Sequence, residues 1–230
     1  MHFEQRFGAR EIKFLLTPER ADEVRAWAKT RLAPDPHTGG GATYRVTSLY
    51  FDTSAFDVFH ARGSYGRAKY RVRRYDEAPT VFVERKMRTD SLVSKRRVAI
   101  EIEEMARIAG PVSGQWPGRW FQRRIEARQL NPVCAITYLR TAMVGKKEDG
   151  TLVRLTLDDA LYADRVDSFT LGEPRQGKPI APGQQILELK YLGEMPEVFK
   201  ELIEAFPLNR IAVSKYRTAA ASLGLAARNA

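Results

Sequence analysis

The sequence predicts an α+β protein in which a closed antiparallel β-barrel carries helices on its outside. Three observations favour this class. Apolar and charged residues alternate along much of the chain, which is typical of strands with one apolar and one polar face. The polar faces carry Arg or Lys together with Glu or Asp on one strand after another, so they differ from ordinary solvated faces. The few amphipathic helices need an apolar surface to cover, and closure provides it while removing exposed sheet edges.

The first strand is expected over residues 10–16, where Ile12 and Phe14 alternate with Glu11 and Lys13. Any single strand of this kind could also belong to an open sheet with its polar side in water. Its repetition favours charged faces that point toward one another inside a barrel. The same alternation predicts further strands over residues 68–75, 81–86, 97–103, 153–158 and 187–190.

Helices are expected in three places. Thr17, followed by Pro18 and Glu19, is a typical helix start, and apolar residues recur at helical spacing after it. A second helix is expected to begin near Gln115. A third is expected to begin at Pro196, because the residues after it form a clear apolar stripe.

One domain is expected over residues 1–230. Loops rich in Pro and Gly are expected over residues 33–42 and 172–183, but the segments on either side have the same character and no internal repeat is present. No run approaches the ~20 apolar residues of a membrane-spanning helix. The single cysteine, Cys134, rules out a disulfide framework and favours a reducing, cytoplasmic location.

Several familiar chemistries are excluded. Gly63 and Gly66 are followed by Arg67 rather than by the Lys-Ser/Thr pair of a nucleotide phosphate loop. The three histidines are scattered without metal-ligand spacing, and no Ser or Cys has a plausible His partner for nucleophilic catalysis. The chemistry that remains is electrostatic.

The charge balance indicates an anionic partner. Lys and Arg number 38 against 28 Asp and Glu, which gives a formal net charge of +10. A barrel interior lined by many cations needs a polyanion, metal ions, or both. Guanidinium and ammonium groups suit phosphoryl oxygens, and carboxylates among them suggest a bridging divalent cation.

A series of motifs carries a more specific indication. They are Tyr70-Arg-Val-Arg-Arg-Tyr75, Phe82-Val-Glu-Arg-Lys86, Ser94-Lys-Arg-Arg97, Tyr138-Leu-Arg140, Val153-Arg-Leu-Thr-Leu-Asp158, Leu187-Glu-Leu-Lys190 and Ser214-Lys-Tyr216. In this order they resemble the catalytic domain of the vacuolar transporter chaperone (VTC) polyphosphate polymerases. That domain belongs to the triphosphate tunnel metalloenzymes of the CYTH-like superfamily. The likeness extends from Glu11 to about Tyr216.

The resemblance implies a tunnel of about eight antiparallel strands and a set of roles within it. Six residues would bind the triphosphate or the growing chain: Lys13, Arg71, Arg73, Lys86, Arg140 and Lys215. Glu188 would hold Mn²⁺ or Mg²⁺, with Glu84, Asp158 and Glu11 as further candidate metal ligands. Lys95, Arg154, Lys190 and Arg210 are candidate substrate-binding cations with less definite roles.

The chain departs from the family pattern at two positions. The superfamily opens with Glu-x-Glu-x-Lys, but Ala9 stands before Glu11 and Lys13, so one acidic ligand is missing. Near the C-terminus a second family lysine is replaced by Ala212, with Arg210 as a candidate substitute. These departures could weaken or alter the activity.

The leading hypothesis is therefore a metal-dependent polyphosphate polymerase, a transferase that moves the terminal phosphate of ATP to polyphosphate or pyrophosphate. The alternatives are a triphosphate hydrolase on the same scaffold and a noncatalytic polyphosphate-binding module. Nucleic acid is disfavoured as a partner, because acidic residues share faces with the cations. A membrane-protein partner, holding the chain at the inner face of a membrane, is an expectation from family analogy alone. The sequence does not determine the oligomeric state.

Overall fold

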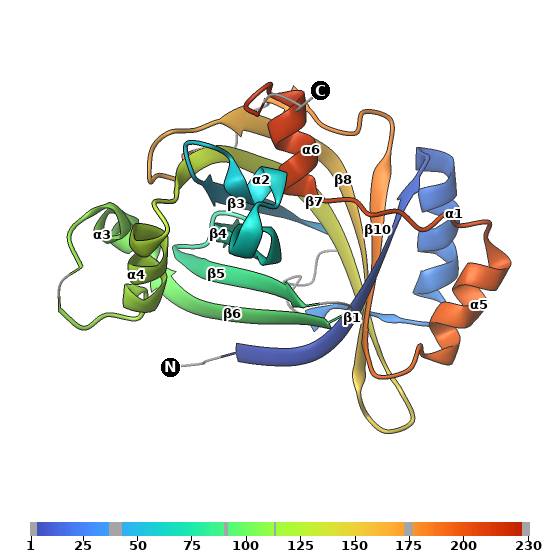
Figure 1. Ribbon diagram of the computed structural model, residues 1–230. Coiled ribbons are helices and arrows are strands. Elements are labelled where there is room, and N and C mark those ends of the chain that lie inside the picture. Colours follow the sequence, from blue (N-terminus) through green and yellow to red (C-terminus); the bar gives the residue numbers. More distant parts are fainter. Residues whose placement is uncertain (1–3, 37–42, 90–91, 113, 173–176, 227–230) are drawn as a thin grey trace.

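The computed structural model describes residues 4–36, 43–89, 92–112, 114–172 and 177–226. In these residues eight antiparallel strands form a closed ring in the order β7-β3-β4-β5-β6-β1-β10-β8, and β8 pairs with β7 to complete it (Figure 1). The ring strands are β1 (Glu4–Leu16), β3 (Thr43–Asp52), β4 (Ala68–Tyr75), β5 (Thr80–Thr89), β6 (Leu92–Glu101), β7 (Asn131–Lys146), β8 (Leu152–Arg165) and β10 (Gln185–Leu192). The expected closed antiparallel arrangement is confirmed.

Two short strands and several helices complete the fold. β2 (Ala33–Pro34) pairs with β7, and β9 (Lys178–Pro179) pairs with β8. The helices are α1 (Pro18–Lys29), α2 (Asp57–His60), α3 (Ala106–Ala109), α4 (Arg119–Ala127), α5 (Glu197–Ala205) and α6 (Lys215–Ser222), with short 3₁₀ turns η2 (Gly63–Arg67) and η3 (Ile102–Met105). None of the helices in the described ranges is long and apolar enough to cross a membrane.

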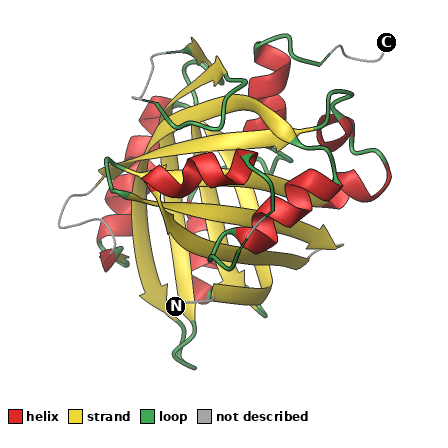
Figure 2. Cartoon of the chain, turned by 90° about the vertical axis from the view of Figure 1, so that its left-hand side faces the viewer, coloured by secondary structure: helices red, strands yellow, loops and turns green. Residues whose placement is uncertain are grey.

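The helices cover the outer, apolar faces of the ring. α1 and α5 lie together on one side, and α3 and α4 lie on the opposite side (Figure 1). Figure 2, turned by 90°, shows helices lying across the outside of the strands. One apolar cluster joins α1 and α5 to the outward residues of β1, β8 and β10, and a second joins α4 to β3, β4 and β5. The inward faces are therefore left to the polar residues.

Local sequence signals explain why α1 forms where expected. The Thr17 side chain accepts a hydrogen bond from the Arg20 backbone N–H and Pro18 occupies the first turn. Its apolar residues Ala21, Val24 and Ala28 are fully buried. The helix therefore begins and packs as its sequence predicts.

Several features differ from expectation. β3 was not predicted, because seven consecutive residues from its centre to its end are buried and the alternation disappears. The second helix begins at Arg119 rather than near Gln115, because Trp116 folds back and donates its indole N–H to Gln122. The strand expected over 97–103 ends at Glu101, where η3 begins. The expected loops over 33–42 and 172–183 contain β2 and β9, and part of each lies outside the described residues.

Candidate functional site

A cavity of about 700 Å³ lies inside the ring and is lined by inward residues of several strands and by α6. Among the described residues its lining holds thirteen cationic side chains and two carboxylates. The cations are Arg10, Lys13, Arg67, Lys69, Arg71, Arg73, Lys86, Arg88, Arg140, Lys190, Arg210, Lys215 and Arg217, and the carboxylates are Glu11 and Glu188. Such an excess of cations favours an anionic ligand.

The structure brings together ten of the fourteen residues that the sequence singled out. These are Lys13, Arg71, Arg73, Lys86, Arg140, Lys190, Arg210, Lys215, Glu11 and Glu188. The other four do not line the cavity: Lys95, Arg154, Glu84 and Asp158. Their positions explain why.

The two cavity carboxylates lie on neighbouring strands and are surrounded by lysines. The register of β1 and β10 sets Glu11 opposite Lys190 and Lys13 opposite Glu188. Lys13 Nζ lies 3.0 Å from Glu11 Oε1 and 3.4 Å from Glu188 Oε2. Lys86 Nζ donates to both Glu11 oxygens, at 2.9 and 2.7 Å, and Lys190 pairs with Glu188. Burial acts to raise the pKa of both carboxyls, but the lysines outweigh it and hold each pKa below its usual range.

Asp158 is enclosed and has strong cationic partners. Its oxygens accept hydrogen bonds from Arg140 Nε and Nη2 at 2.6 and 2.8 Å, and it also pairs with Lys215. The side chain is fully buried. Burial acts to raise the pKa of Asp158, but Arg140 and Lys215 reverse this and depress it. Asp158 thus fixes the orientation of two cations that do line the cavity.

Glu84 has the same relation to Arg71. Arg71 Nε and Nη2 both lie 2.6 Å from Glu84 Oε2. Lys95 and Arg97 lie at 3.6 and 3.8 Å from its other oxygen. The Glu84 side chain is 1% exposed, and these cations overcome the effect of burial to lower its pKa. Lys95 is therefore directed at Glu84 rather than into the cavity.

Arg154, the fourth of these residues, contacts side chains outside the cavity lining. Its Nη2 donates to the Tyr44 hydroxyl at 2.9 Å and lies 2.7 Å from Asp35 Oδ2. Asp35 is 3% exposed. The predicted role of Arg154 in substrate binding is not favoured by this position.

Two cavity cations have only uncharged partners among the described residues. Arg73 is 4% exposed and donates to Ser48 Oγ at 3.0 Å and to the Tyr138 hydroxyl at 3.1 Å. Lys69 Nζ donates to Ser214 Oγ at 2.7 Å. Burial, assisted by repulsion from Lys13 and other cations, lowers the pKa of Lys69 to about 7. A buried charge without a counterion costs free energy, so both residues would be stabilised by an anion in the cavity.

Aromatic hydroxyls are site residues that the sequence reasoning missed. The Tyr138 hydroxyl accepts from Arg73 and from Arg140, the latter at 3.3 Å. The Tyr50 hydroxyl accepts from Arg71 at 3.2 Å. Tyr138 lies two residues before Arg140, so shared strand parity was the available signal. Lys69 was detectable in the same way, two residues before Arg71.

The donor set fits a metal ion that arrives with a phosphate ligand. In the described ranges no group of three or more His, Cys, Asp or Glu could hold a metal alone. Glu11 and Glu188 both face the cavity beside Lys13. Mg²⁺ is commonly bound by one or two carboxylates together with substrate phosphates, which this pair could provide. Glu84 and Asp158 are less suited, because their oxygens already face cations in enclosed positions.

Comparisons with known proteins agree with the geometry. The family model described as VTC domain matches residues 8–224. A solved structure from Hippeastrum, described as a candidate adenylyl cyclase with a dominant triphosphatase activity, has a TM-score of 0.50 and 16% identity, covering 96% of this chain and 98% of its own. A candidate adenylate cyclase from Bacillus halodurans has a TM-score of 0.51 and 15% identity, covering 90% and 95%. No curated protein matches by sequence. At these identities the two structures show a shared fold.

Proposed function

The chain belongs to the VTC domain family, and from this premise we propose that it is a metal-dependent polyphosphate polymerase. It transfers the terminal phosphate of ATP to a polyphosphate chain inside the cavity. The observation that carries the proposal is the set of thirteen cations against two carboxylates in the described lining. Their charge far exceeds that of one triphosphate group, which favours a long polyanion as ligand.

Phosphoryl transfer asks a protein mainly to align the reactants and to neutralise their charge. Arg71 and Arg140 are suited to alignment, because Glu84 and Asp158 hold their guanidinium groups in fixed orientations. Arg73 is held by neutral hydroxyls and keeps its full charge for phosphate oxygens. These three residues would position the phosphates of donor and acceptor.

The lysines supply mobile charge. Lys13, Lys86 and Lys190 neutralise the two cavity carboxylates in the ligand-free chain. An ammonium group on a flexible stem can turn to a phosphate oxygen when one arrives. Lys215 adds a further charge from the first turn of α6, and Arg210 lines the same cavity.

Glu188 and Glu11 are the residues that would hold Mn²⁺ or Mg²⁺. When bound, such an ion supplies neutralisation of the negative charge on the phosphoryl oxygens. The missing acid at Ala9 leaves two cavity carboxylates in the described lining, a number that suits an ion shared with the substrate.

A triphosphate hydrolase is the second candidate. The same fold in the Hippeastrum protein is associated with a dominant triphosphatase activity. Hydrolysis would use the same cations and carboxylates, with water as the acceptor in place of polyphosphate. Double-stranded nucleic acid is a poor candidate ligand, because a cavity of about 700 Å³ inside the ring is too small for a duplex.

Product analysis tests the proposal. The protein is incubated with ATP and Mn²⁺ or Mg²⁺, and polyphosphate and free phosphate are separated on a gel and quantified. We expect metal-dependent polyphosphate longer than the donor triphosphate, and at least about a hundredfold less of it from Glu188→Gln. Free phosphate alone would establish the hydrolase. If the protein binds polyphosphate but does not turn over ATP with either metal ion, it is a binding module.

A further inference from the structure

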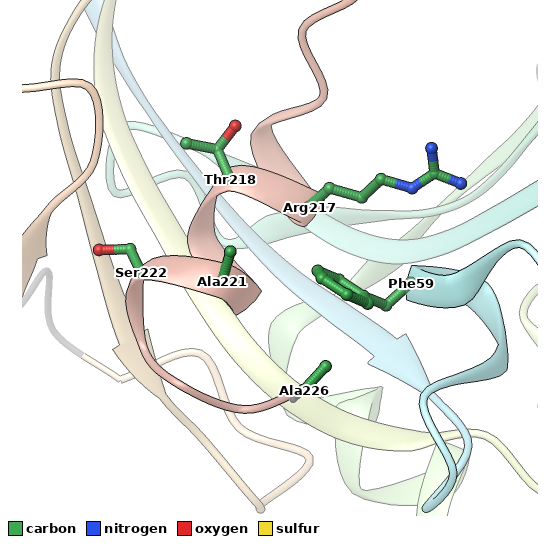
Figure 3. A pocket seen from close by; sticks show the side chains of 6 residues that line it. All are labelled: Phe59, Arg217, Thr218, Ala221, Ser222 and Ala226. Atoms are coloured by element: carbon green, nitrogen blue, oxygen red, sulfur yellow. The ribbon is translucent and has the colours of Figure 1, made fainter. Parts of the chain in front are cut away.

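A second pocket, of about 680 Å³, lies between α2 and the outer side of α6 (Figure 3). It is lined by one residue of α2, four of α6 and one residue after α6: Phe59, Arg217, Thr218, Ala221, Ser222 and Ala226. Figure 3 shows the Phe59 ring projecting toward α6, with the Arg217 side chain leaving the helix above it. The pocket thus offers an aromatic face beside a cation.

Arg217 connects this pocket to the cationic cavity. Its side chain lines both spaces. Arg217 is exposed, and among the residues that the structure describes no oxygen accepts a hydrogen bond or ion pair from its guanidinium group. A ligand with a charged part in the cavity and a flat part in the pocket would therefore pass Arg217.

One buried carboxylate fixes both walls of the pocket. Asp52, at the end of β3, is fully buried. Its oxygens accept from the backbone N–H groups of Val58 and Phe59, each at 2.9 Å, and from the Tyr216 hydroxyl. The ring of Tyr216 also stacks on Tyr50, with centroids 5.4 Å apart. Because Phe59 and Arg217 adjoin these anchored positions, the pocket is set before any ligand binds.

We propose that this pocket binds the base of the nucleoside triphosphate donor, stacked on Phe59, while the phosphates extend past Arg217 into the cavity. The inference rests on the proposed function. It adds the place at which the protein distinguishes the nucleotide donor from inorganic polyphosphate. A base presents a π-face that stacks on aromatic rings without needing a specific hydrogen-bond pattern. A guanidinium group beside the ring can contact both the base and the first phosphate.

The test compares two ligands that share a triphosphate group but differ in the base. Calorimetry without metal measures the affinities of ATP and of inorganic triphosphate for the full chain and its variants. Phe59→Leu keeps an apolar side chain but removes the stacking face, and Phe59→Trp keeps such a face. Tyr65→Leu is the matched control, because Tyr65 also lies beside a guanidinium group, that of Arg128, but lines neither space.

Phe59→Leu is expected to weaken ATP binding about tenfold and to leave inorganic triphosphate binding unchanged. Phe59→Trp should retain ATP affinity, and Tyr65→Leu should change neither ligand. Equal weakening of both ligands by Phe59→Leu would overturn the inference, because Phe59 would then only support the cavity. Unchanged ATP affinity would also overturn it.

The same measurement separates failure of the inference from failure of the proposed function. If the unmodified chain binds inorganic triphosphate tightly, but Phe59→Leu and Phe59→Trp have the same ATP affinity as each other, only the proposed base site is wrong. If the unmodified chain binds neither ligand, the polymerase proposal is wrong and the base site falls with it.

Discussion

Two pairs of carboxylates inside the same ring have different surroundings. Glu11 and Glu188 line the cavity and are neutralised by lysines. Glu84 and Asp158 are enclosed behind the cavity wall, and each accepts two contacts from one arginine. A guanidinium fork binds a carboxylate in a fixed geometry, whereas an ammonium group is a mobile point charge. The enclosed pair is therefore suited to hold cations in place, and the cavity pair is suited to exchange partners when a ligand enters.

The largest expected effect comes from breaking the enclosed pair. Asp158→Asn leaves Arg140 and Lys215 buried without their counterion. Loss of one partner from a buried ion pair costs about 3–5 kcal/mol. The free energy of unfolding, measured by urea denaturation, should fall by that amount. Asp149→Asn, at an exposed position, is the control and should have little effect. A loss for Asp158→Asn as small as that of the control would contradict the structural role of Asp158.

Glu188→Gln tests the other side of the comparison. It keeps the shape but removes a charge that a metal ion would need, so turnover of ATP should fall at least about a hundredfold, or roughly 2.7 kcal/mol. Stability should fall less than in Asp158→Asn, because Lys13 retains Glu11 and Lys190 is partly exposed. Metal-free triphosphate binding, measured by calorimetry, should persist or tighten. Near-normal turnover would assign the metal to another carboxylate, and lost metal-free binding would give Glu188 a supporting role only.

Substitutions of Arg73 and Arg71, two residues apart on β4, should have different effects on the stability of the protein. Arg73→Leu removes a buried cation with neutral partners, so the melting temperature should stay unchanged or rise. Arg71→Leu removes the closest partner of Glu84, so the melting temperature should fall. Both should weaken triphosphate binding by about 1.5–3 kcal/mol, the range for a hydrogen bond to a charged group. If either variant keeps the wild-type affinity for triphosphate, the substituted arginine does not contact the ligand.

Lys69 gives the smallest expected effect, through pH. Its pKa, lowered by burial to about 7, lies below the ordinary value of 10.5. The unfolded chain therefore binds more protons between pH 7 and 10.5, and the stability contributed by this residue rises with pH in that window. An anionic ligand favours the charged amine, so the ratio of wild-type to Lys69→Met triphosphate affinity should fall about tenfold from pH 6 to 8. Using the ratio cancels titration of the ligand. A ratio independent of pH would show that Lys69 keeps one charge state.

Much of the fold followed from local patterns. Strand β4 was expected over residues 68–75 and forms over Ala68–Tyr75, because apolar and charged residues alternate regularly along it and turn-forming residues flank it. Strand β3 was missed because both of its faces are buried, which removes the periodic signal. Helix α6 was also missed, although Ser214 caps it by accepting from the Arg217 N–H, because its short run of alanines has no clear apolar stripe.

The sequence by itself determined the closed antiparallel class, the family and which strand positions share the inward face, because side-chain parity and residue chemistry are local properties. It did not determine which of the inward charges meet the cavity. Glu84 and Glu11 look alike in sequence, yet one is closed off by Arg71 and the other faces the open space. That difference depends on strand register, which sets Glu84 opposite Arg71 and Glu11 opposite Lys190, and on the distances between each carboxylate and the cations around it. Only the tertiary structure sets these distances, and with them the charge that each residue presents to a ligand.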